Sequence, residues 1–313
     1  MSTAPETTYK FSFIGVTTGQ SAMTKIFPHW MAALNRPDVV LEGIDCKIHD
    51  EPERYRAIVA AIKADPLALG GLITTHKLDL LAAARDLFDT LDPYAQTCDE
   101  ISCITKQDGQ LAGYAVDPVA DGQALHAIIG DNHFGRTKGA VLCLGAGGAA
   151  TAIVLYLLNR RQVADRPKYF TVVDVDQARL DHIQAMVQKV GSDIQFEYIC
   201  NADPAVTDQL LTTLTAGSVV INATGMGKDL PGSPITEKAK FPKHSIVWEL
   251  NYRGERAFYQ QALAQQKSRK LIVEDGWVAF LHGWTGVISH VLHTPIDGGK
   301  FTQLAKLAAQ MRG

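Results

Sequence analysis

Neither sign of charge is in clear excess in this sequence. Its 313 residues include 30 Lys and Arg against 33 Asp and Glu, which gives a formal net charge of −3. No run rich in Lys or Arg stands out either, so the chain lacks the electrostatic footprint of a protein that binds nucleic acid or an anionic membrane surface. Both classes of partner are therefore disfavoured.

Long apolar runs are also missing. A membrane-spanning helix needs about 20 consecutive apolar residues, and no stretch of the sequence approaches that length. Residues 1–6 are polar and acidic rather than basic and then apolar, which does not fit a secretory signal. We expect a cytoplasmic protein that has no membrane partner.

Cysteines and histidines with metal-binding spacing are absent too. None of the five cysteines stands in a Cys-x-x-Cys arrangement, and they are predicted to be small, reduced core residues: Cys46, Cys98, Cys103, Cys143 and Cys200. The only helically spaced histidine pair, His290 and His293, has no third ligand nearby in the sequence. We expect no metal site.

What the chain does contain is a glycine-rich motif between a strand and a helix. Apolar residues 141–144 lead into Gly145-Ala146-Gly147-Gly148-Ala149-Ala150, and residues 151–159 have a helical pattern. Gly145 permits a tight turn, Gly147 lets the backbone approach a pyrophosphate, and the helix N-terminus faces the negative charge. Gly145 to Ala149 are therefore candidate dinucleotide-binding residues. Because glycine-rich turns also connect ordinary strands and helices, the motif alone is not decisive.

A second strand, over residues 169–174, ends in Asp174. A carboxylate at this position accepts hydrogen bonds from the adenosine ribose and repels the 2′-phosphate of NADP, so Asp174 favours NAD over NADP. Val175 and Asp176 follow where an NADP-binding chain often has Arg, Ser or Thr. The alternative is that Asp174 caps the helix that begins near Gln177.

The chain reads as two consecutive α/β domains. The first hundred residues predict a βαβαβ order, with strands at 10–16, 39–46 and 69–73 and helices at 19–34 and 51–64. A helix over 79–91, a hairpin of 101–106 and 110–115 around Asp108-Gly109, and a linking helix over 119–129 follow. We expect a substrate-binding domain at 1–120, completed by about 277–313, and an NAD-binding domain at 121–276, with the polar segment 131–138 marking the boundary.

The second half predicts a Rossmann-type, doubly wound sheet. Its strands are expected at 141–144, 169–174, 194–200, 218–224, 245–251 and 270–274, and closing helices at 276–292 and 301–311, the last returning to the first domain. The fold class is therefore α/β, with an open α/β domain before the nucleotide domain. Ligands bind at the carboxyl ends of such strands, which selects residues 17–21, 74–77 and the loop 225–234, where the nicotinamide would lie.

In this order of parts the chain resembles the shikimate/quinate dehydrogenase family. The resemblance rests on the glycine motif, on Asn222-Ala223-Thr224-Gly225-Met226, on the 108–117 run and on Thr75-His76-Lys77. It implies that Lys77 and Asp117 are the catalytic pair, and that Asn222, Thr224, Gly225 and Met226 contact the cofactor. The chemistry agrees, because removing hydride from an alcohol leaves a hydroxyl proton that a lysine beside an aspartate can take. The alternatives are a solvated helix residue for Lys77 and an N-cap before Pro118 for Asp117.

The substrate motifs depart from the family pattern. A Ser-x-Ser-Pro sequence is replaced by Ser21-Ala22-Met23-Thr24, an asparagine falls at Ser102 or Cys103, and a glutamine is matched by His282, while Tyr252 is retained. The substrate-binding residues implied are Ser21, Thr24, Thr75, Ser102, Tyr252 and His282. With Met23 in place of a hydroxyl donor, we expect poor turnover of shikimate itself, unless Thr18, Gln20 or Thr24 supplies the missing donor.

The resemblance implies an NAD-dependent oxidoreductase that transfers hydride between the nicotinamide and a ring hydroxyl of shikimate, quinate or a related cyclic hydroxy acid. Such an enzyme acts in aromatic amino acid biosynthesis or on related acids, as a monomer or homodimer. An alternative from another class is an NAD-binding sensor that has lost catalysis, which the altered substrate motifs would suit. Retention of both Lys77 and Asp117 argues against it.

Overall fold

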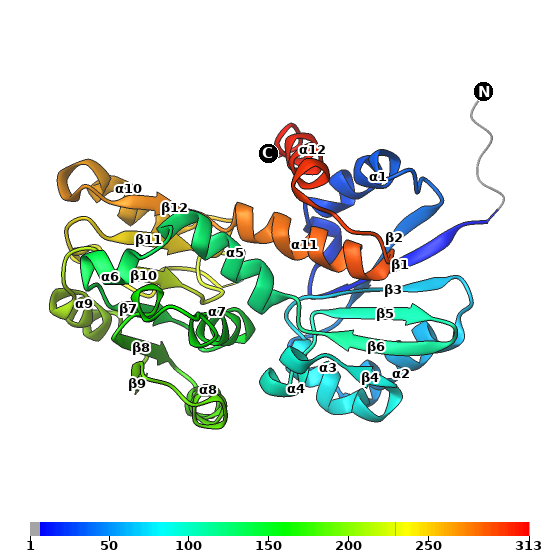
Figure 1. Ribbon diagram of the computed structural model, residues 1–313, viewed down its shortest axis with the longest axis horizontal. Coiled ribbons are helices and arrows are strands. Elements are labelled where there is room, and N and C mark those ends of the chain that lie inside the picture. Colours follow the sequence, from blue (N-terminus) through cyan, green and yellow to red (C-terminus); the bar gives the residue numbers. More distant parts are fainter. Residues whose placement is uncertain (1–6, 229, 313) are drawn as a thin grey trace. The chain divides into compact units, whose positions relative to one another are not determined.

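The computed structural model describes residues 7–228 and 230–312, which form two compact units (Figure 1). Unit 1 extends to Val116 and resumes at Gly283, and unit 2 comprises Asp117–His282. Residues 1–6, on which part of the expected localisation rests, and Asp229 of the loop 225–234 lie outside the described residues. In the part of the chain that is described, no helix is long and apolar enough to cross a membrane.

Unit 1 is built on a mixed sheet of six strands. The strands are β1 (Tyr9–Gly15), β2 (Val39–Asp45), β3 (Ala68–Ile73), β4 (Thr90–Leu91), β5 (Cys103–Gln107) and β6 (Gln110–Tyr114). Their order is β2-β1-β3-β5-β6-β4, with β1 parallel to both neighbours and β5 antiparallel to β3 and β6. The predicted βαβαβ order and the hairpin are both confirmed. Asp108 and Gly109 have φ of +52° and +78°, as a two-residue hairpin turn requires.

Helices cover both faces of this sheet. They are α1 (Met23–Ala33), α2 (Pro52–Ala64), α3 (Lys77–Ala84), α4 (Pro93–Cys98) and α12 (Gly298–Ala309), with two short 3₁₀ turns, η1 (Thr18–Gln20) and η2 (Arg85–Leu87). Helix α11 (Trp277–Val291) belongs to unit 1 from Gly283 onward. Alternate side chains of β1 pack on opposite faces of the sheet, because successive side chains of a strand point in opposite directions.

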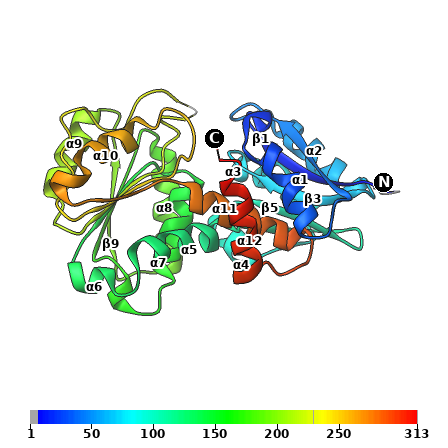
Figure 2. The ribbon, with the colours of Figure 1, turned by 90° about the horizontal axis from the view of Figure 1, so that it is seen from above.

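Phe13 of β1 meets Trp284 of α11 with ring centroids 4.9 Å apart, whereas Ile14 joins the core formed with α2 and α3. On the first of these faces, Trp30 Nε1 of α1 donates to the backbone oxygen of Leu304 at 2.9 Å. The C-terminal helix α12 therefore packs on α1, as expected for a helix that returns to the first domain (Figure 2).

The segment after Lys77 differs from its predicted structure. The helix expected over 79–91 ends at Ala84, and η2 and the short strand β4 take its place. The backbone of Asp89 pairs with Leu111, which draws the chain into the sheet beside β6. Helix α4, which was not predicted, begins at Pro93 after Asp92, whose carboxylate accepts from Ala95 N at 2.9 Å.

Unit 2 is built on a parallel sheet of six strands. They are β7 (Val141–Leu144), β8 (Tyr169–Asp174), β9 (Gln195–Cys200), β10 (Val219–Asn222), β11 (Ile246–Glu249) and β12 (Ile272–Glu274), in the order β12-β11-β10-β7-β8-β9. This is the doubly wound order, in which successive strands are added first on one side of β7 and then, from β10 onward, on its other side. The predicted Rossmann-type topology is confirmed, and its switch point lies at the ends of these two strands.

The helices of unit 2 are α5 (Asp117–Ile129), α6 (His133–Thr137), α7 (Gly148–Leu158), α8 (Gln177–Val190), α9 (Pro204–Thr213) and α10 (Ala257–Arg269), with a 3₁₀ turn η3 (Val163–Asp165). Leu211 of α9 and Phe258 of α10 pack with Val220 and Val247 on one face, and α5 packs on α7 at the other (Figure 2). The segment 131–138, expected at the domain boundary, forms α6 within unit 2.

Four of the cysteines are buried, but Cys200 is exposed at the end of β9. Its predicted place in the core is therefore wrong. The edge strand β9 has few buried residues, so its last side chain points to solvent.

Candidate functional site

The glycine motif forms the turn between β7 and α7. Gly145 has φ of +106°, and a Cβ added to it would lie 2.7 Å from the backbone carbonyl of Ala223, so only glycine fits. Gly147 precedes α7, has no capping side chain, and has nothing within 4 Å of the place where a Cβ would stand. An uncapped helix N-terminus beside open space suits an anion. These residues therefore fit the pyrophosphate of a dinucleotide.

The Asp174 carboxylate fastens this turn from the neighbouring strand. It is only 9% exposed; its Oδ2 accepts from Ala146 N at 2.6 Å and its Oδ1 accepts from Asp176 N at 2.9 Å. Asp176, not Asp174, caps α8, since its carboxylate accepts from Ala178 N at 2.9 Å. At the end of β8 the exposed residues are Val175, at 69%, and the Asp176 side chain, at 48%.

The segment Asn222–Met226 lies at the carboxyl end of β10, next to the switch point. Asn222 is fully buried, and its Oδ1 accepts from the backbone N of Thr224 at 3.1 Å and from Thr224 Oγ1 at 2.6 Å. Thr224 Oγ1 in turn accepts from Met226 N at 3.2 Å. The segment predicted to contact the nicotinamide is therefore internally ordered by its own polar side chains.

Two residues of the next strand extend this network. Glu249 accepts from Asn222 Nδ2 at 2.8 Å and from Asn251 N at 2.8 Å. Asn251 Nδ2 donates to the backbone oxygens of Thr224 at 3.3 Å and of Met226 at 2.9 Å. Burial raises the pKa of the Glu249 carboxyl to about 7, although both hydrogen bonds and the nearby Arg256 charge act to lower it.

Sequence reasoning did not assign Glu249 or Asn251 to the site. The signal was present, because both are polar residues that close an otherwise apolar strand at the sheet edge where ligands bind. What the sequence could not show is that Glu249 lies opposite Asn222, since that register joins residues of two separate strands.

Tyr252 and His282 belong to unit 2. The Tyr252 ring lies 4.3 Å from that of Phe280 and 5.9 Å from that of Trp277, so the three form an aromatic cluster near the end of β11. His282 is half-buried on α11, and burial lowers its pKa. These ring contacts fit a shape-filling role for Tyr252.

In unit 1, η1 and the start of α1 carry the predicted carboxylate-binding residues. Ser21 is buried and its Oγ accepts from Met23 N at 3.3 Å, while Thr24 is exposed and donates to the backbone oxygen of Ser21 at 2.8 Å. Met23 is 0% exposed. The expectation that Met23 places an apolar group in the substrate pocket is therefore wrong, because its side chain belongs to the core.

The end of β3 carries Thr75 and Lys77. Thr75 is exposed, and Lys77 is the first residue of α3, with its backbone oxygen accepting from Ile101 N at 3.4 Å. The residue between them, His76, is buried, and its Nδ1 lies 2.9 Å from Tyr55 Oη. Burial lowers the pKa of His76 and so disfavours its charged form. Lys77 therefore follows directly after a buried, packed residue.

Ser102 directly precedes β5, and Asp117 follows β6, so the two residues flank the β5–β6 hairpin. Ser102 is buried and its Oγ accepts from Val116 N at 2.9 Å, directly before Asp117 begins α5. Ser102 therefore fixes the backbone that leads into Asp117. Lys77 and Asp117 belong to different units, and Asp117 is half-buried.

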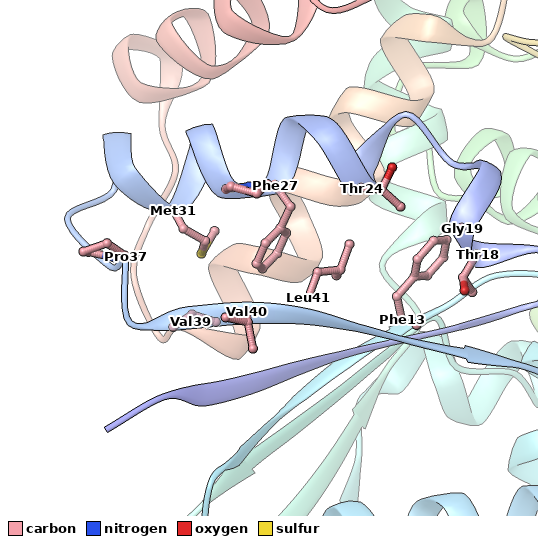
Figure 3. A pocket seen from close by; sticks show the side chains of 12 residues that line it. Phe13, Thr18, Gly19, Thr24, Phe27, Met31, Pro37, Val39, Val40 and Leu41 are labelled. Atoms are coloured by element: carbon pink, nitrogen blue, oxygen red, sulfur yellow. The ribbon is translucent and has the colours of Figure 1, made fainter. Parts of the chain in front are cut away.

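A pocket of about 510 Å³ lies between α1 and the strands β1 and β2 (Figure 3). Its lining is mostly apolar and contains no charged side chain: Phe13, Thr18, Gly19, Thr24, Phe27, Pro28, Met31, Pro37, Val39, Val40, Leu41 and Gly43. The hydroxyl of Thr18, at the end of the pocket near Thr24, donates to Asp45 Oδ1 at 2.6 Å. Such a lining does not match a polyhydroxylated acid, so we do not assign the substrate to this pocket.

Residues 7–228 and 230–312 contain no group of three or more His, Cys, Asp and Glu side chains arranged to bind a metal ion.

No family model matches the chain. It is 24% identical over 233 residues to the shikimate dehydrogenase (NADP(+)) of Symbiobacterium thermophilum, covering 74% of this chain and 72% of that protein. It is 25% identical over 276 residues to the shikimate dehydrogenase (NADP(+)) of Methylobacterium radiotolerans, covering 86% of each. Both alignments cover more than two thirds of this chain and of the relative.

Solved structures share the fold. A shikimate dehydrogenase in complex with NADP+ matches with a TM-score of 0.72 at 16% identity, over 98% of this chain and 96% of that one. A quinate dehydrogenase from Corynebacterium glutamicum in complex with NAD gives 0.71 at 17%, over 97% and 100%. A ligand-free 5-ketofructose reductase of a Gluconobacter strain gives 0.69 at 17%, over 98% and 100%. The predicted fold class is confirmed.

Proposed function

We propose that this shikimate dehydrogenase-like chain is a nicotinamide-dependent dehydrogenase that acts on a ring hydroxyl of shikimate, quinate or a related cyclic hydroxy acid. The observation that carries the proposal is the glycine turn at the switch point of unit 2, with its uncapped helix and the space beside Gly147. The named activities of the relatives supply the reaction class.

We assign the steps of the reaction to residues of this chain as follows. A bound nicotinamide would supply the acceptor for the hydride that leaves the alcohol carbon. Lys77 takes the proton of the same hydroxyl group, so that a carbonyl forms, and returns it in the reverse direction. Asp117 orients the lysine and accepts a hydrogen bond from the substrate. The hydrogen bond between His76 and Tyr55 fixes the backbone from which the Lys77 side chain extends.

Substrate contacts are proposed for Thr24, Thr75, Tyr252 and His282. Thr24 and Thr75 are exposed and so can reach a ligand. Ser21 and Ser102 are buried and hold backbone groups, so we propose that they shape the site more than they bind the acid. With Met23 in the core, the argument for poor turnover of shikimate loses its main support.

We propose NAD as the preferred cofactor. In the proposed binding mode, the two carboxylates at the end of β8 would put negative charge close to the 2′-phosphate of NADP, which disfavours that cofactor. Because the Asp174 oxygens already accept from the backbone of the glycine turn, we propose Asp176 as the ribose-facing carboxylate. The curated relatives named above carry NADP(+) in their names, and the solved structures include complexes with each cofactor, so this preference needs a direct test.

The catalytically inactive sensor is the second candidate. The relatives reported above are all named as dehydrogenases, which does not favour it. The discriminating experiment mixes the protein with NAD or NADP and a panel of shikimate, quinate and related acids, and follows the absorbance of the reduced cofactor. Because one structural neighbour is named a 5-ketofructose reductase, the panel also includes that ketose with NADH and NADPH. Cofactor binding without turnover of any compound would favour the sensor.

Lys77→Ala tests the catalytic assignment. We expect kcat to fall by about 10²–10⁴ with nearly unchanged cofactor affinity, since proton transfer contributes about that factor. Lys106→Ala is the matched control, because this lysine of β5 donates to the backbone oxygen of Asp65 at 2.6 Å and has no assigned catalytic role. Turnover at the wild-type rate in Lys77→Ala would exclude Lys77 as the acid/base.

A further inference from the structure

One buried carboxylate orders the edge of the sheet in unit 2. Glu249 is 1% exposed at the end of β11, and it accepts one hydrogen bond on each oxygen, from Asn222 Nδ2 and from Asn251 N. A carboxylate is a pure acceptor, so it fixes the amide of Asn222 with its nitrogen toward β11 and its oxygen toward Thr224.

Asn222 and Asn251 both form hydrogen bonds with the same short segment. Asn222 Oδ1 accepts from Thr224 N and Oγ1, and Asn251 Nδ2 donates to the backbone oxygens of Thr224 and Met226. Without an acceptor at Glu249, Asn222 Nδ2 would be a buried donor that has lost this partner, and only the two bonds to Thr224 would hold the amide in this orientation. Glu249 thus acts on Thr224 and Met226 through residues that it positions.

The segment also touches the phosphate-binding turn. A Cβ at Gly145 would lie 2.7 Å from the carbonyl of Ala223 and 2.9 Å from Thr224 N, so the two backbones are in close contact. Ala223 N also donates to Leu144 O at 2.7 Å. A displacement of the Asn222–Met226 segment therefore disturbs the glycine turn as well.

We propose that Glu249, in its ionised form, is a positioning residue for the dinucleotide: through Asn222 it holds the Asn222–Met226 segment in the shape that the nicotinamide end of the cofactor binds. The inference rests on the proposed function. Glu249 makes no contact with the reacting atoms in this scheme. Its effect reaches the cofactor through the backbone of Thr224 and Met226.

Protonation of Glu249 is expected to weaken its positioning of the Asn222–Met226 segment. Burial raises the pKa of Glu249 to about 7, and a protonated carboxyl facing two N–H donors must give up or weaken one hydrogen bond. The charged group that acts on Glu249 is Arg256 at the start of α10, which pairs with Asp275 at 2.8 Å. Glu274 at the end of the neighbouring strand β12 lies opposite Trp248, and its pKa is also raised by burial. Arg256 opposes the shift of Glu249 without removing it.

The test is a fluorescence titration of the whole protein with NADH between pH 6 and pH 8. For the wild type we expect the affinity to fall about tenfold as the pH drops from 8 to 6, because one pH unit below a pKa leaves about a tenth of the group ionised. Glu249→Gln should bind NADH about tenfold more weakly at pH 8 and show a flat profile. Glu274→Gln, on the neighbouring strand, is the matched control and should keep the wild-type profile.

Each outcome decides. Wild-type affinity and pH dependence in Glu249→Gln would overturn the positioning role and assign the titration to another group, such as the half-buried His282. A wild type that binds neither NADH nor NADPH overturns the proposed function together with this inference, whereas binding that is independent of pH overturns this inference alone. If Glu249→Gln does not fold, Glu249→Asp keeps the charge with a shorter reach, and its pH dependence should persist with weaker binding.

Discussion

Asp174 and Asp176 stand two positions apart and have different surroundings. Asp174 is buried and both of its oxygens accept backbone N–H groups, one of them from the glycine turn. Asp176 is half-exposed, caps α8 and lies 3.7 Å from Arg179. Hydrogen bonds to a carboxylate contribute about 1.5–3 kcal/mol each, so Asp174 is expected to stabilise the turn whichever cofactor binds there.

The paired variants Asp174→Asn and Asp176→Asn separate the two roles. Asp174→Asn loses one acceptor and should weaken NAD and NADP by the same factor, roughly tenfold or more. Asp176→Asn keeps the cap, since asparagine is also a good N-cap, and should narrow the preference for NAD by removing one charge. Dissociation constants for both cofactors give the measurement. If only Asp174→Asn changes the ratio of the NAD and NADP dissociation constants, then Asp174, and not Asp176, is the carboxylate that faces the ribose.

Met23 shows how a single buried side chain changes an interpretation. In the sequence it occupies a position where a hydroxyl is expected, and in the structure it is 0% exposed within α1. Met23→Ser should therefore lower the free energy of unfolding by about 2–5 kcal/mol, the usual cost of emptying such a site. The exposed Ala32→Ser on the same helix should stay within about 0.5 kcal/mol. Urea unfolding measures both, and a gain in kcat/KM toward shikimate in Met23→Ser would contradict the core assignment.

At the level of elements, the backbone of the glycine turn packs directly against the backbone of the Asn222–Met226 segment. Gly145 is constrained by the protein, since its φ is +106° and its Cβ position is filled by Ala223. Gly147 is not constrained in this way, because nothing of the protein lies within 4 Å of its Cβ position. The space at Gly147 is therefore available to a ligand, whereas the space at Gly145 is already occupied.

The substitutions Gly145→Ala and Gly147→Ala should differ accordingly. Gly145→Ala should destabilise the protein without ligand by about 1–3 kcal/mol, through backbone strain and the clash with Ala223. Gly147→Ala should lower that stability by about 1 kcal/mol or less, because alanine is a poorer N-cap residue than glycine, and still lower the affinity for NADH at least tenfold. Thermal unfolding without ligand and an NADH titration give the two readings. Unchanged affinity in Gly147→Ala would place the pyrophosphate elsewhere.

The sequence could predict those elements whose signals are local. The apolar run into Gly145 and the Asp108-Gly109 turn gave a strand-to-helix turn and a hairpin, and both occur where expected. The helix expected over 79–91 failed because pairing of Asp89 with Leu111 overrides the local helical pattern. In the same way, Glu249 meets Asn222 of the neighbouring strand and Asp174 meets Ala146 in the turn after the neighbouring strand, and no local pattern reports a register between strands.

At the level of the whole molecule, each unit has its own sheet and its own hydrophobic core. The core of unit 1 gathers side chains of α2, α3 and the mixed sheet, and that of unit 2 gathers α9, α10 and the parallel sheet. Both cores could be predicted, because the periodicity of strands and helices restarts after residue 139. Lys77 and Asp117 come from different units, and their pairing was predicted from the family resemblance and from the chemistry of proton removal.

Stability and cofactor binding should respond to pH in opposite directions. The pKa of Glu249 is about 7 in the folded chain against an ordinary value of 4.5. Between these values the folded state binds more protons than the unfolded state, so this group lowers the free energy of unfolding as the pH rises from 4.5 to 7. Over the whole window the loss is about 3 kcal/mol, at about 1.4 kcal/mol for each pKa unit.

Urea unfolding of the wild type and Glu249→Gln at pH 5 and pH 8 isolates this contribution. Other carboxylates titrate equally in both proteins, so they cancel in the difference between the two. We expect Glu249→Gln to gain up to about 3 kcal/mol relative to the wild type between pH 5 and pH 8, in the transition that belongs to unit 2. Over the same range the wild type should bind NADH more tightly. A difference between the two proteins that does not change with pH would mean that Glu249 is already ionised at pH 5, and its ionisation could then not account for pH-dependent cofactor binding near neutrality.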